Sequence, residues 1–471
     1  MKKGKINIII MNICMGILIV FMLTVLIRTF ARQVLVKRLG MDNIFTQTIL
    51  FDNNVLQNKN CQREGREAEV DIDWREYYPF DNELSVSSAE NKKVTFIENF
   101  EDTIATVTNN IDVYTSDFLI GYDTWIKIHE YYHLMLHWTL NTEDGMEGEV
   151  IFTMDNGYLT YKVDKLTDNE RIEIANSVED FNSFLYENKI PFYYINAGSK
   201  VNPNDRQLSG VSLLEENTNE NGDALLAELD KRNINNIDMR QLMMDDKLDW
   251  YSSYYITDHH WTTDTGLWCS SKIAEVLNDN GFDYDLSLFE PSSFERTVYN
   301  DFWFGGQATG KKLVGCKRET YVRILPTFET YFEVNIPTQR YNESGNYDEV
   351  LFDEKSFSGI QDYSDEDFLS NISPYNCIRW TNDALGTIKN NTTQHNADKN
   401  ILIIQDSFGW YSATFLACQT GEVDLIYPSE FNGSIRKYIE DTKPDAVIVM
   451  YCEKNIKPIN WSNHESFFDF R

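Results

Sequence analysis

Over the last two thirds of the chain, an amphipathic stretch is repeatedly followed by a short apolar run. Residues 169–188 carry apolar side chains at helical spacing, and residues 190–195 form an apolar run with the length of a buried strand. The end of the chain repeats this order. Strands are predicted there at residues 399–404, 423–427 and 445–451, and helices at residues 408–417 and 435–442.

Continuous apolar strands between amphipathic helices are typical of a parallel sheet with helices on both faces. Two further helices are predicted at residues 221–231 and 268–280. The stretch at about residues 289–395 breaks the order and predicts an insertion of loops and short strands. The expected fold is therefore a three-layer α/β/α domain with a parallel sheet and insertions, over residues 91–471.

The N-terminus has a different pattern, because residues 6–27 form an almost uninterrupted apolar run that is long enough to cross a bilayer. Three lysines precede the run, which predicts a cytoplasmic tip and an exported remainder. A cleaved signal peptide is the competing interpretation, but the residues after the run form a poor cleavage site. We therefore expect a single-pass membrane anchor over residues 1–33 and a membrane-proximal spacer over residues 34–90.

Charge and cysteine content narrow the classes of function. The 471 residues carry a formal net charge of −32, and no basic stripe is visible that would suit a nucleic acid or an anionic membrane. The seven cysteines are widely spaced without a C-x-x-C pair. The sequence therefore indicates neither a cysteine zinc site nor a redox motif, and it assigns no disulfide pairing.

Asp406 and Ser407 directly follow the predicted strand at residues 399–404 and precede the predicted helix at residues 408–417. The carboxyl end of a strand in an open α/β sheet is where ligands bind, and the unpaired N–H groups of a helix N-terminus can stabilise a developing oxyanion. Ser407 is thus a candidate nucleophile. An ordinary helix N-cap explains the same two residue types.

Asp258-His259-His260-Trp261 is the second polar cluster, and it holds two of the seven histidines. A serine hydroxyl needs a base, and the base works best when a carboxylate orients it. In an extended segment alternate side chains share one face, which pairs Asp258 with His260 and turns His259 away. His260 is therefore the expected base and Asp258 its orienter.

A zinc site is a further hypothesis, because the stretch from His129 to His133 matches the His-Glu-x-x-His pattern. That pattern requires a helix, whereas residues 133–138 alternate as a strand does. We predict no metal site.

The segment from Thr257 to Thr262 resembles the signature of the DHHW family, which is similar to the SGNH-hydrolase-like domain of the AlgX and AlgJ alginate O-acetylation proteins. The resemblance covers about residues 90–460 and includes further blocks in the same order. These blocks lie at residues 191–195, 198–200, 304–307, 403–408 and 443–449.

In the acetylating relatives the matching residues act as a Ser-His-Asp triad, so the resemblance implies Ser407 as nucleophile, His260 as base and Asp258 as orienter. Gln405 stands where the superfamily has a glycine, which leaves the geometry of the turn open. Further candidates for oxyanion or substrate contacts, each with a plain structural alternative, are Gly305, Gly306, His259, Trp261 and Lys200.

The resemblance implies an extracytoplasmic carbohydrate O-acetyltransferase or acetylesterase that acts on a cell-surface or secreted polysaccharide, without a cofactor. It also implies a membrane protein that passes the acetyl group outward. The alternative is a non-catalytic SGNH-like module for carbohydrate binding or polysaccharide assembly. A lipase or protease of the α/β-hydrolase kind is less supported, because the sequence has no G-x-S-x-G elbow.

Overall fold

The computed structural model describes residues 142–143, 150–208, 216–311, 313, 315–370, 372–379, 381–461 and 466–471. The expected anchor, the spacer and the His-Glu-x-x-His stretch lie outside these residues, so the domain boundaries at residues 33 and 90 stay predictions. Within the described ranges, no helix combines the length and the apolar character that a membrane span needs.

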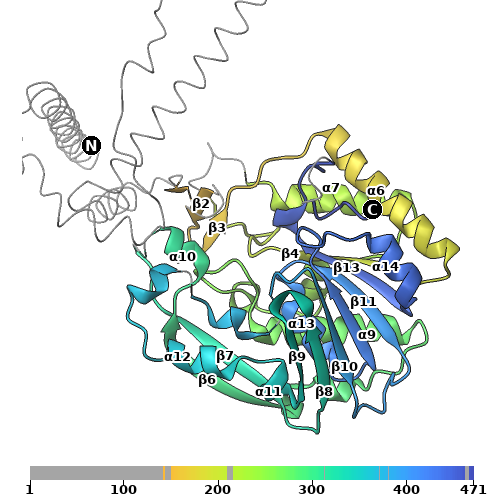
Figure 1. Ribbon diagram of the computed structural model, residues 1–471. Coiled ribbons are helices and arrows are strands. Elements are labelled where there is room, and N and C mark those ends of the chain that lie inside the picture. Colours follow the sequence, from red (N-terminus) through yellow and green to blue (C-terminus); the bar gives the residue numbers. More distant parts are fainter. Residues whose placement is uncertain are drawn as a thin grey trace, which may run out of the picture. The chain divides into compact units, whose positions relative to one another are not determined.

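An eight-stranded mixed sheet forms the centre, in the strand order β5-β4-β13-β11-β12-β10-β8-β9 (Figure 1). Five neighbouring strands are parallel, as the sequence predicts. Their bounds are β4 (Phe192–Gly198), β5 (Asn236–Asp238), β11 (Asn400–Gln405), β12 (Glu422–Ile426) and β13 (Ala446–Cys452).

The prediction of a purely parallel sheet is wrong for the other three strands, because each of them pairs antiparallel with its neighbours. The 3₁₀ turn at Pro337–Gln339 and the left-handed Arg340, with φ 54°, join two of them as a hairpin, and a connection this short can link only antiparallel strands. All three come from the expected insertion or its end. They are β8 (Phe332–Ile336), β9 (Tyr341–Gly345) and β10 (Leu385–Asn390).

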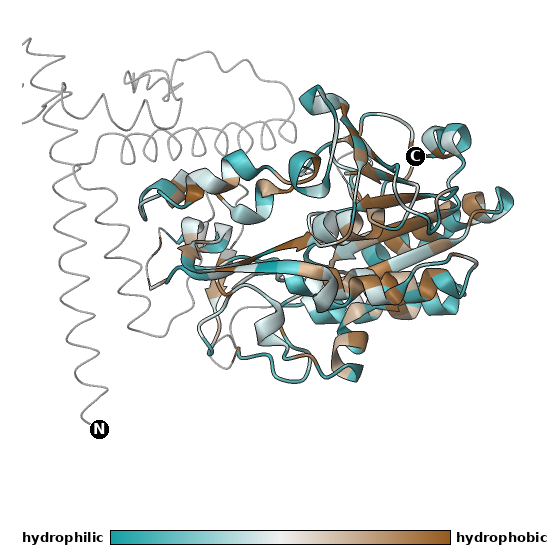
Figure 2. Cartoon of the chain, turned by 90° about the horizontal axis from the view of Figure 1, so that it is seen from below, coloured by the Kyte–Doolittle hydropathy of each residue, from teal (hydrophilic) through white to brown (hydrophobic). Residues whose placement is uncertain are grey.

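Helices cover both faces of the sheet, since alternate side chains of β4, β11 and β13 enter two separate cores. On β11, Ile401 and Ile403 pack with α9 (Thr263–Asn278) and α13 (Gly409–Ala417). The second core holds Leu402, Ile404 and the helices of the other face (Figure 1), and Figure 2 shows the apolar strands between the two helical layers. These helices are α6 (Asp168–Glu187), α7 (Thr218–Lys231) and α14 (Ile435–Thr442).

Helix starts follow local capping. Thr167 and Glu170 form a capping box at the start of α6. Helix α9 begins five residues earlier than predicted, because the Thr262 hydroxyl accepts a hydrogen bond from Thr265 N and caps the helix there. The Asp258-His259-His260-Trp261 motif therefore ends directly at a helix N-terminus.

The remaining elements form two smaller sheets and several short helices. The strands are β1 (Thr142–Glu143), β2 (Val150–Thr153) and β3 (Leu159–Tyr161) in one small sheet, and β6 (Phe294–Trp303) and β7 (Glu319–Pro326) in another. The helices are α8 (Met239–Asp245), α10 (Gly306–Gly310), α11 (Tyr347–Val350) and α12 (Glu354–Ile360). Further 3₁₀ turns lie at Tyr251–Ser253, Leu286–Phe289, Pro291–Ser293, Asp367–Ser370, Pro374–Cys377 and Glu453–Asn455.

Strand β11 lies at the point where the chain changes direction within the sheet. It leads through α13 to its neighbour β12 and then through α14, on the opposite face, to its other neighbour β13. Such a switch point leaves a crevice at the carboxyl end of the strand. Ser407 follows β11 at this crevice.

Candidate active site

The nucleophile turn, residues 405–409, is held to the neighbouring strand by the buried Asp406. One of its carboxylate oxygens accepts from Phe408 N at 3.0 Å, and the other accepts from Cys452 N at 2.7 Å and Asn455 Nδ2 at 2.8 Å. Burial raises the pKa of Asp406 against the effect of these hydrogen bonds. The turn that carries Ser407 is thus anchored at the end of β13.

Gln405 stands where the SGNH-like sequences that this chain resembles have a glycine. It is the last residue of β11 and is buried. Its side chain fills the space beside Gly409, where a Cβ would lie 2.2 Å from Gln405 Oε1. The glycine that eases close packing is therefore at position 409, behind the serine.

Ser407, His260 and Asp258 form one hydrogen-bonded row. His260 Nε2 lies 2.6 Å from Ser407 Oγ, and His260 Nδ1 lies 2.5 Å from Asp258 Oδ1. Because a carboxylate only accepts hydrogen bonds, the imidazole proton belongs on Nδ1 and leaves Nε2 free to accept from the serine. Burial acts to raise the pKa of Asp258, but His260 and His259 together lower it well below the usual range.

The base segment, residues 255–261, does not have the extended conformation that alternate side chains on one face would require. Asp258 Oδ1 also accepts from the backbone N–H of His260 at 3.0 Å, and Tyr255 N donates to His260 O at 3.1 Å. The segment is therefore a tight turn. Asp258 and His260 meet because the carboxylate bridges the turn, and not because alternate residues of a strand share a face.

Aromatic side chains enclose the base. The ring of Tyr375 stacks on His260 with centroids 4.2 Å apart, and Phe408 and Trp410 lie at 5.4 and 5.8 Å. The Tyr375 hydroxyl also donates to Ser407 O at 3.4 Å. Sequence reasoning missed Tyr375, because it belongs to the irregular insertion and no local pattern distinguishes it from the other 25 tyrosines.

His259 does not point away from Asp258 and His260 as the extended segment predicted: its Nδ1 lies 3.9 Å from Asp258 Oδ1, and its ring lies beside His260 with centroids 3.8 Å apart. Burial, with His260 next, lowers the pKa of His259 well below its usual value. Trp261 corrects a prediction: it is fully buried and packs on Phe408 at 5.2 Å, so it belongs to the core and cannot reach a substrate.

Gly305 and Gly306 do not have the expected oxyanion geometry, because other acceptors already hold their N–H groups. Gly305 N donates to Thr257 Oγ1 at 2.9 Å, and Gly306 N donates to Asp258 Oδ2 at 3.1 Å. A Cβ on Gly305 would lie 2.4 Å from Asp258 N. The two glycines therefore pack against the base segment and orient Asp258.

Lys200 also differs from the expected contact in the substrate cleft. It is 2% exposed, and its ammonium group donates to the carbonyl oxygens of Tyr255 at 2.8 Å and Asp258 at 2.5 Å. Glu319 binds N–H groups of the same segment, and the sequence did not predict this role. One acidic residue among 74 carries no local signal when its partners lie 62 and 63 residues away.

A metal ion is an alternative occupant of the triad region, since Asp258, His259 and His260 bring ligand atoms within 4.8 Å of one another. Both ring nitrogens of His260 are already hydrogen-bonded, to Asp258 and to Ser407. This arrangement favours proton transfer over metal coordination.

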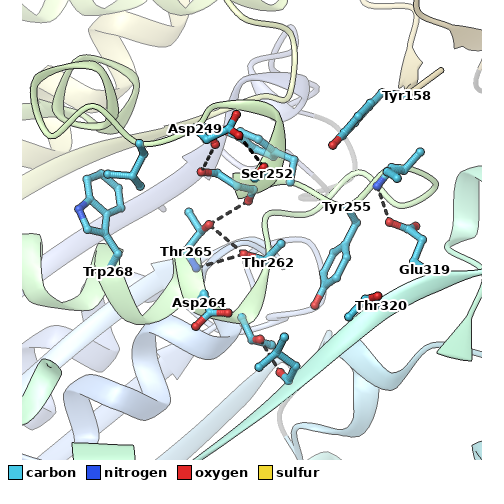
Figure 3. Close-up of a pocket in the computed structure, with 16 residues that line it drawn as sticks. Tyr158, Asp249, Ser252, Tyr255, Thr262, Asp264, Thr265, Trp268, Glu319 and Thr320 are labelled. Carbon is cyan, nitrogen blue, oxygen red and sulfur yellow. Dashed lines mark hydrogen bonds between the residues drawn. The ribbon is translucent and has the colours of Figure 1, made fainter. Parts of the chain in front are cut away.

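A groove of about 470 Å³ is lined in part by Tyr255 and Ile256 at the start of the base segment. Figure 3 shows its lining, with Tyr158, Asp249 and Trp268 around it and Glu319 hydrogen-bonded at its wall. Neither Ser407 nor His260 lines this groove, so it is separate from the triad.

Comparison with known proteins identifies the fold. No protein-family model matches the sequence, and no curated protein is significantly similar to it. Bacillus cereus PatB1, solved with a sulfonyl adduct, is 18% identical and covers 69% of this chain and 98% of its own, with a TM-score of 0.54. This chain shares the fold of PatB1.

Two other solved structures are more distant. A DHHW family protein from Eubacterium siraeum is 11% identical over 65% of this chain and 91% of its own, with a TM-score of 0.48. The O-acetyltransferase domain of Pseudomonas putida AlgJ is 11% identical over 66% and 93%, with a TM-score of 0.38. The structural neighbours thus include a DHHW family protein and an AlgJ domain, the groups that the motif at Asp258 resembles.

Proposed function

We propose that this chain is a serine-dependent carbohydrate O-acetyltransferase or acetylesterase. The observation that carries the proposal is the row from Ser407 through His260 to Asp258 at the carboxyl end of β11. Its distances are those of a nucleophile, a general base and an orienting carboxylate. The resemblance of the base segment to the DHHW signature supports acetyl groups as the transferred acyl groups.

In the first half of the reaction, Ser407 Oγ attacks the carbonyl carbon of an acetyl ester as its proton moves to His260 Nε2. The new ester bond forms on Ser407, the bond to the donor oxygen breaks, and His260 returns the proton to that leaving oxygen. Asp258 stabilises the imidazolium that exists between these steps. In the second half, a sugar hydroxyl or water gives its proton to His260 and attacks the acetyl carbon. The bond from this carbon to Ser407 Oγ breaks, and His260 returns the proton to Ser407 Oγ as the acetylated sugar or acetate leaves.

The oxyanion would be stabilised by backbone N–H groups at the start of α13. Those of Phe408 and Gly409 already donate to Asp406, to the carboxylate and the carbonyl oxygen respectively. The N–H of Ser407 itself is therefore our candidate donor.

The proposed acceptor is a polysaccharide outside the cell. An anchor at residues 6–27 would keep the domain at the membrane surface, near a membrane protein that supplies acetyl groups. The net charge of −32 argues against a densely anionic polymer as acceptor, because repulsion would oppose its approach.

The test is release of acetate from a chromogenic acetyl ester by the purified full-length chain, beside Ser407→Ala and His260→Ala. We expect both variants to lose activity while their circular dichroism stays unchanged. Ser252→Ala is the matched control, because this exposed serine lines the separate groove and donates only to Asp249.

Intact mass after a rapid quench should show one acetyl group on the parent and on the Ser252→Ala control, and none on Ser407→Ala. An inactive parent, or equal activity in all four proteins, would contradict the proposal. Either outcome would favour a non-catalytic carbohydrate-binding module.

A further inference from the structure

The base segment lacks regular secondary structure, so contacts from other parts of the chain determine its position. Its carbonyl oxygens and its N–H groups are held by two charged residues from distant parts of the chain. Lys200, just after β4, binds the carbonyl oxygens, and Glu319, the first residue of β7, binds the N–H groups.

Lys200 uses every hydrogen of its ammonium group. Nζ donates to Tyr255 O at 2.8 Å, to Asp258 O at 2.5 Å and to Gln307 Oε1 at 3.0 Å. A neutral amine has only two hydrogens, so this pattern fits the charged form. Because Asp258 supplies one of these carbonyl groups, Lys200 contacts the backbone of the orienter directly.

Glu319 binds N–H groups of the base segment. Its carboxylate accepts from Thr257 N at 2.7 Å, and also from Ile256 N and the Thr257 hydroxyl. Figure 3 shows Glu319 pointing to the backbone of the segment. The Thr257 hydroxyl in turn accepts from Gly305 N, which ties the segment to the turn that binds Asp258 through Gly306.

The two charges depend on each other. Burial lowers the pKa of Lys200, and the negative charge of Glu319 opposes that shift; burial likewise raises the pKa of Glu319, and Lys200 opposes it. Removing one partner leaves the other charge buried without compensation, whereas removing both avoids that cost.

We propose that Lys200 and Glu319 are positioning residues, which hold the base segment so that His260 Nε2 meets Ser407 Oγ. This inference rests on the proposed function, because it assumes that the triad carries out acyl transfer. Neither residue touches the reacting atoms. Both act on Asp258 and His260 through the peptide groups of residues 255–258.

The first test replaces the link between Glu319 and the glycine turn. Thr257→Val keeps the shape of the side chain but removes the hydroxyl, and Thr257→Ser keeps the hydroxyl. We expect Thr257→Val to lower kcat about 100-fold, as small displacements of catalytic groups do, with KM nearly unchanged. Thr257→Ser should restore most of kcat.

A readout that does not depend on turnover separates this inference from the proposed function. The proton between His260 and Asp258 should give a low-field NMR signal in the parent and in Thr257→Ser, and the signal should shift or vanish in Thr257→Val. A parent that shows this signal but no esterase activity would contradict the function alone. An unchanged signal and kcat in Thr257→Val would contradict the positioning role.

The second test uses Lys200→Met, Glu319→Gln and the double variant, with Lys311→Met as the control for loss of another largely buried lysine, which donates to Thr153. Each single variant should lower the Tm, and the double variant should regain part of it because no buried charge is left unpaired. Its kcat should nevertheless stay low, since the ammonium group of Lys200 and the carboxylate of Glu319 no longer hold the peptide groups of residues 255–258. Recovery of kcat together with the Tm would reduce the pair to a purely structural role and overturn the proposal.

Discussion

The nucleophile turn and the base segment meet at one hydrogen bond, yet they are positioned in opposite ways. Ser407 follows the central strand β11, and the regular ladders to β12 and β13 determine where it lies. His260 lies in a turn without ladder neighbours. The side chains of Lys200 and Glu319 and the backbone N–H of Gly306 hold that turn from distant parts of the chain.

The two regions therefore owe their positions to different kinds of interaction. A parallel ladder positions the strand that leads to Ser407 through many backbone hydrogen bonds, and Asp406 then anchors the turn to the end of β13. The base segment depends on a few buried polar contacts, and each unpaired buried group costs about 1–3 kcal/mol. Substitutions on the base side should therefore reduce catalysis more than equivalent substitutions behind the nucleophile.

The largest expected effect tests the centre of the base segment. Asp258→Asn keeps the size of the side chain but removes the carboxylate that holds the proton on His260 Nδ1. We expect kcat for an acetyl ester to fall by about 10⁴-fold, the scale typical of a lost orienting carboxylate. A fall of less than tenfold would show that the turn orients His260 without Asp258.

Gly305→Ala should have the next largest effect, because its Cβ would lie 2.4 Å from backbone atoms of Thr257 and Asp258. Backbone cannot rotate aside as a side chain can, so the base segment must move. We expect kcat to fall about 100-fold, measured beside the low-field NMR signal of the His260–Asp258 proton. An unchanged kcat with a shifted Tm would contradict the expectation that catalysis is more sensitive to changes at the base segment than at the nucleophile turn.

Gly409→Ala is the matched change behind the nucleophile, where the Cβ would meet the side chain of Gln405. We expect a loss of about 1–3 kcal/mol in the free energy of unfolding, as for other overpacked sites, measured by chemical denaturation. Because the strand ladders still place Ser407, kcat should fall less than in Gly305→Ala. The reverse order of the two kcat values would break the comparison.

The smallest effect is expected for His259→Gln. His259 contacts the edge of the Tyr161 ring and lies beside His260, but it does not enter the row to Ser407. We expect kcat to change by less than about tenfold, which is small against the 10²–10⁴-fold contribution of a general base. Loss of activity as large as in His260→Ala would mean that the two histidines exchange roles.

The buried parallel strands could be predicted from the sequence because burial on both faces demands an unbroken apolar run. Residues 399–404 and 445–451 therefore correspond closely to β11 and β13. The resemblance and the position of Ser407 also selected the three residues that the structure brings together. For Asp258 and His260 the pairing was correct, but the extended segment assumed for it was wrong.

The sequence by itself thus determined which residues are buried in strands and which have the side-chain types that acyl transfer would need, because periodicity and residue type are local properties. Only the tertiary structure decided that Lys200 is buried, that Gly305 and Gly306 face Asp258, and that Glu319 holds the base segment. Those roles depend on hydrogen-bond partners about 50 to 60 residues away. A buried charge is tolerated only where packing brings such partners to it, and no local pattern records that arrangement.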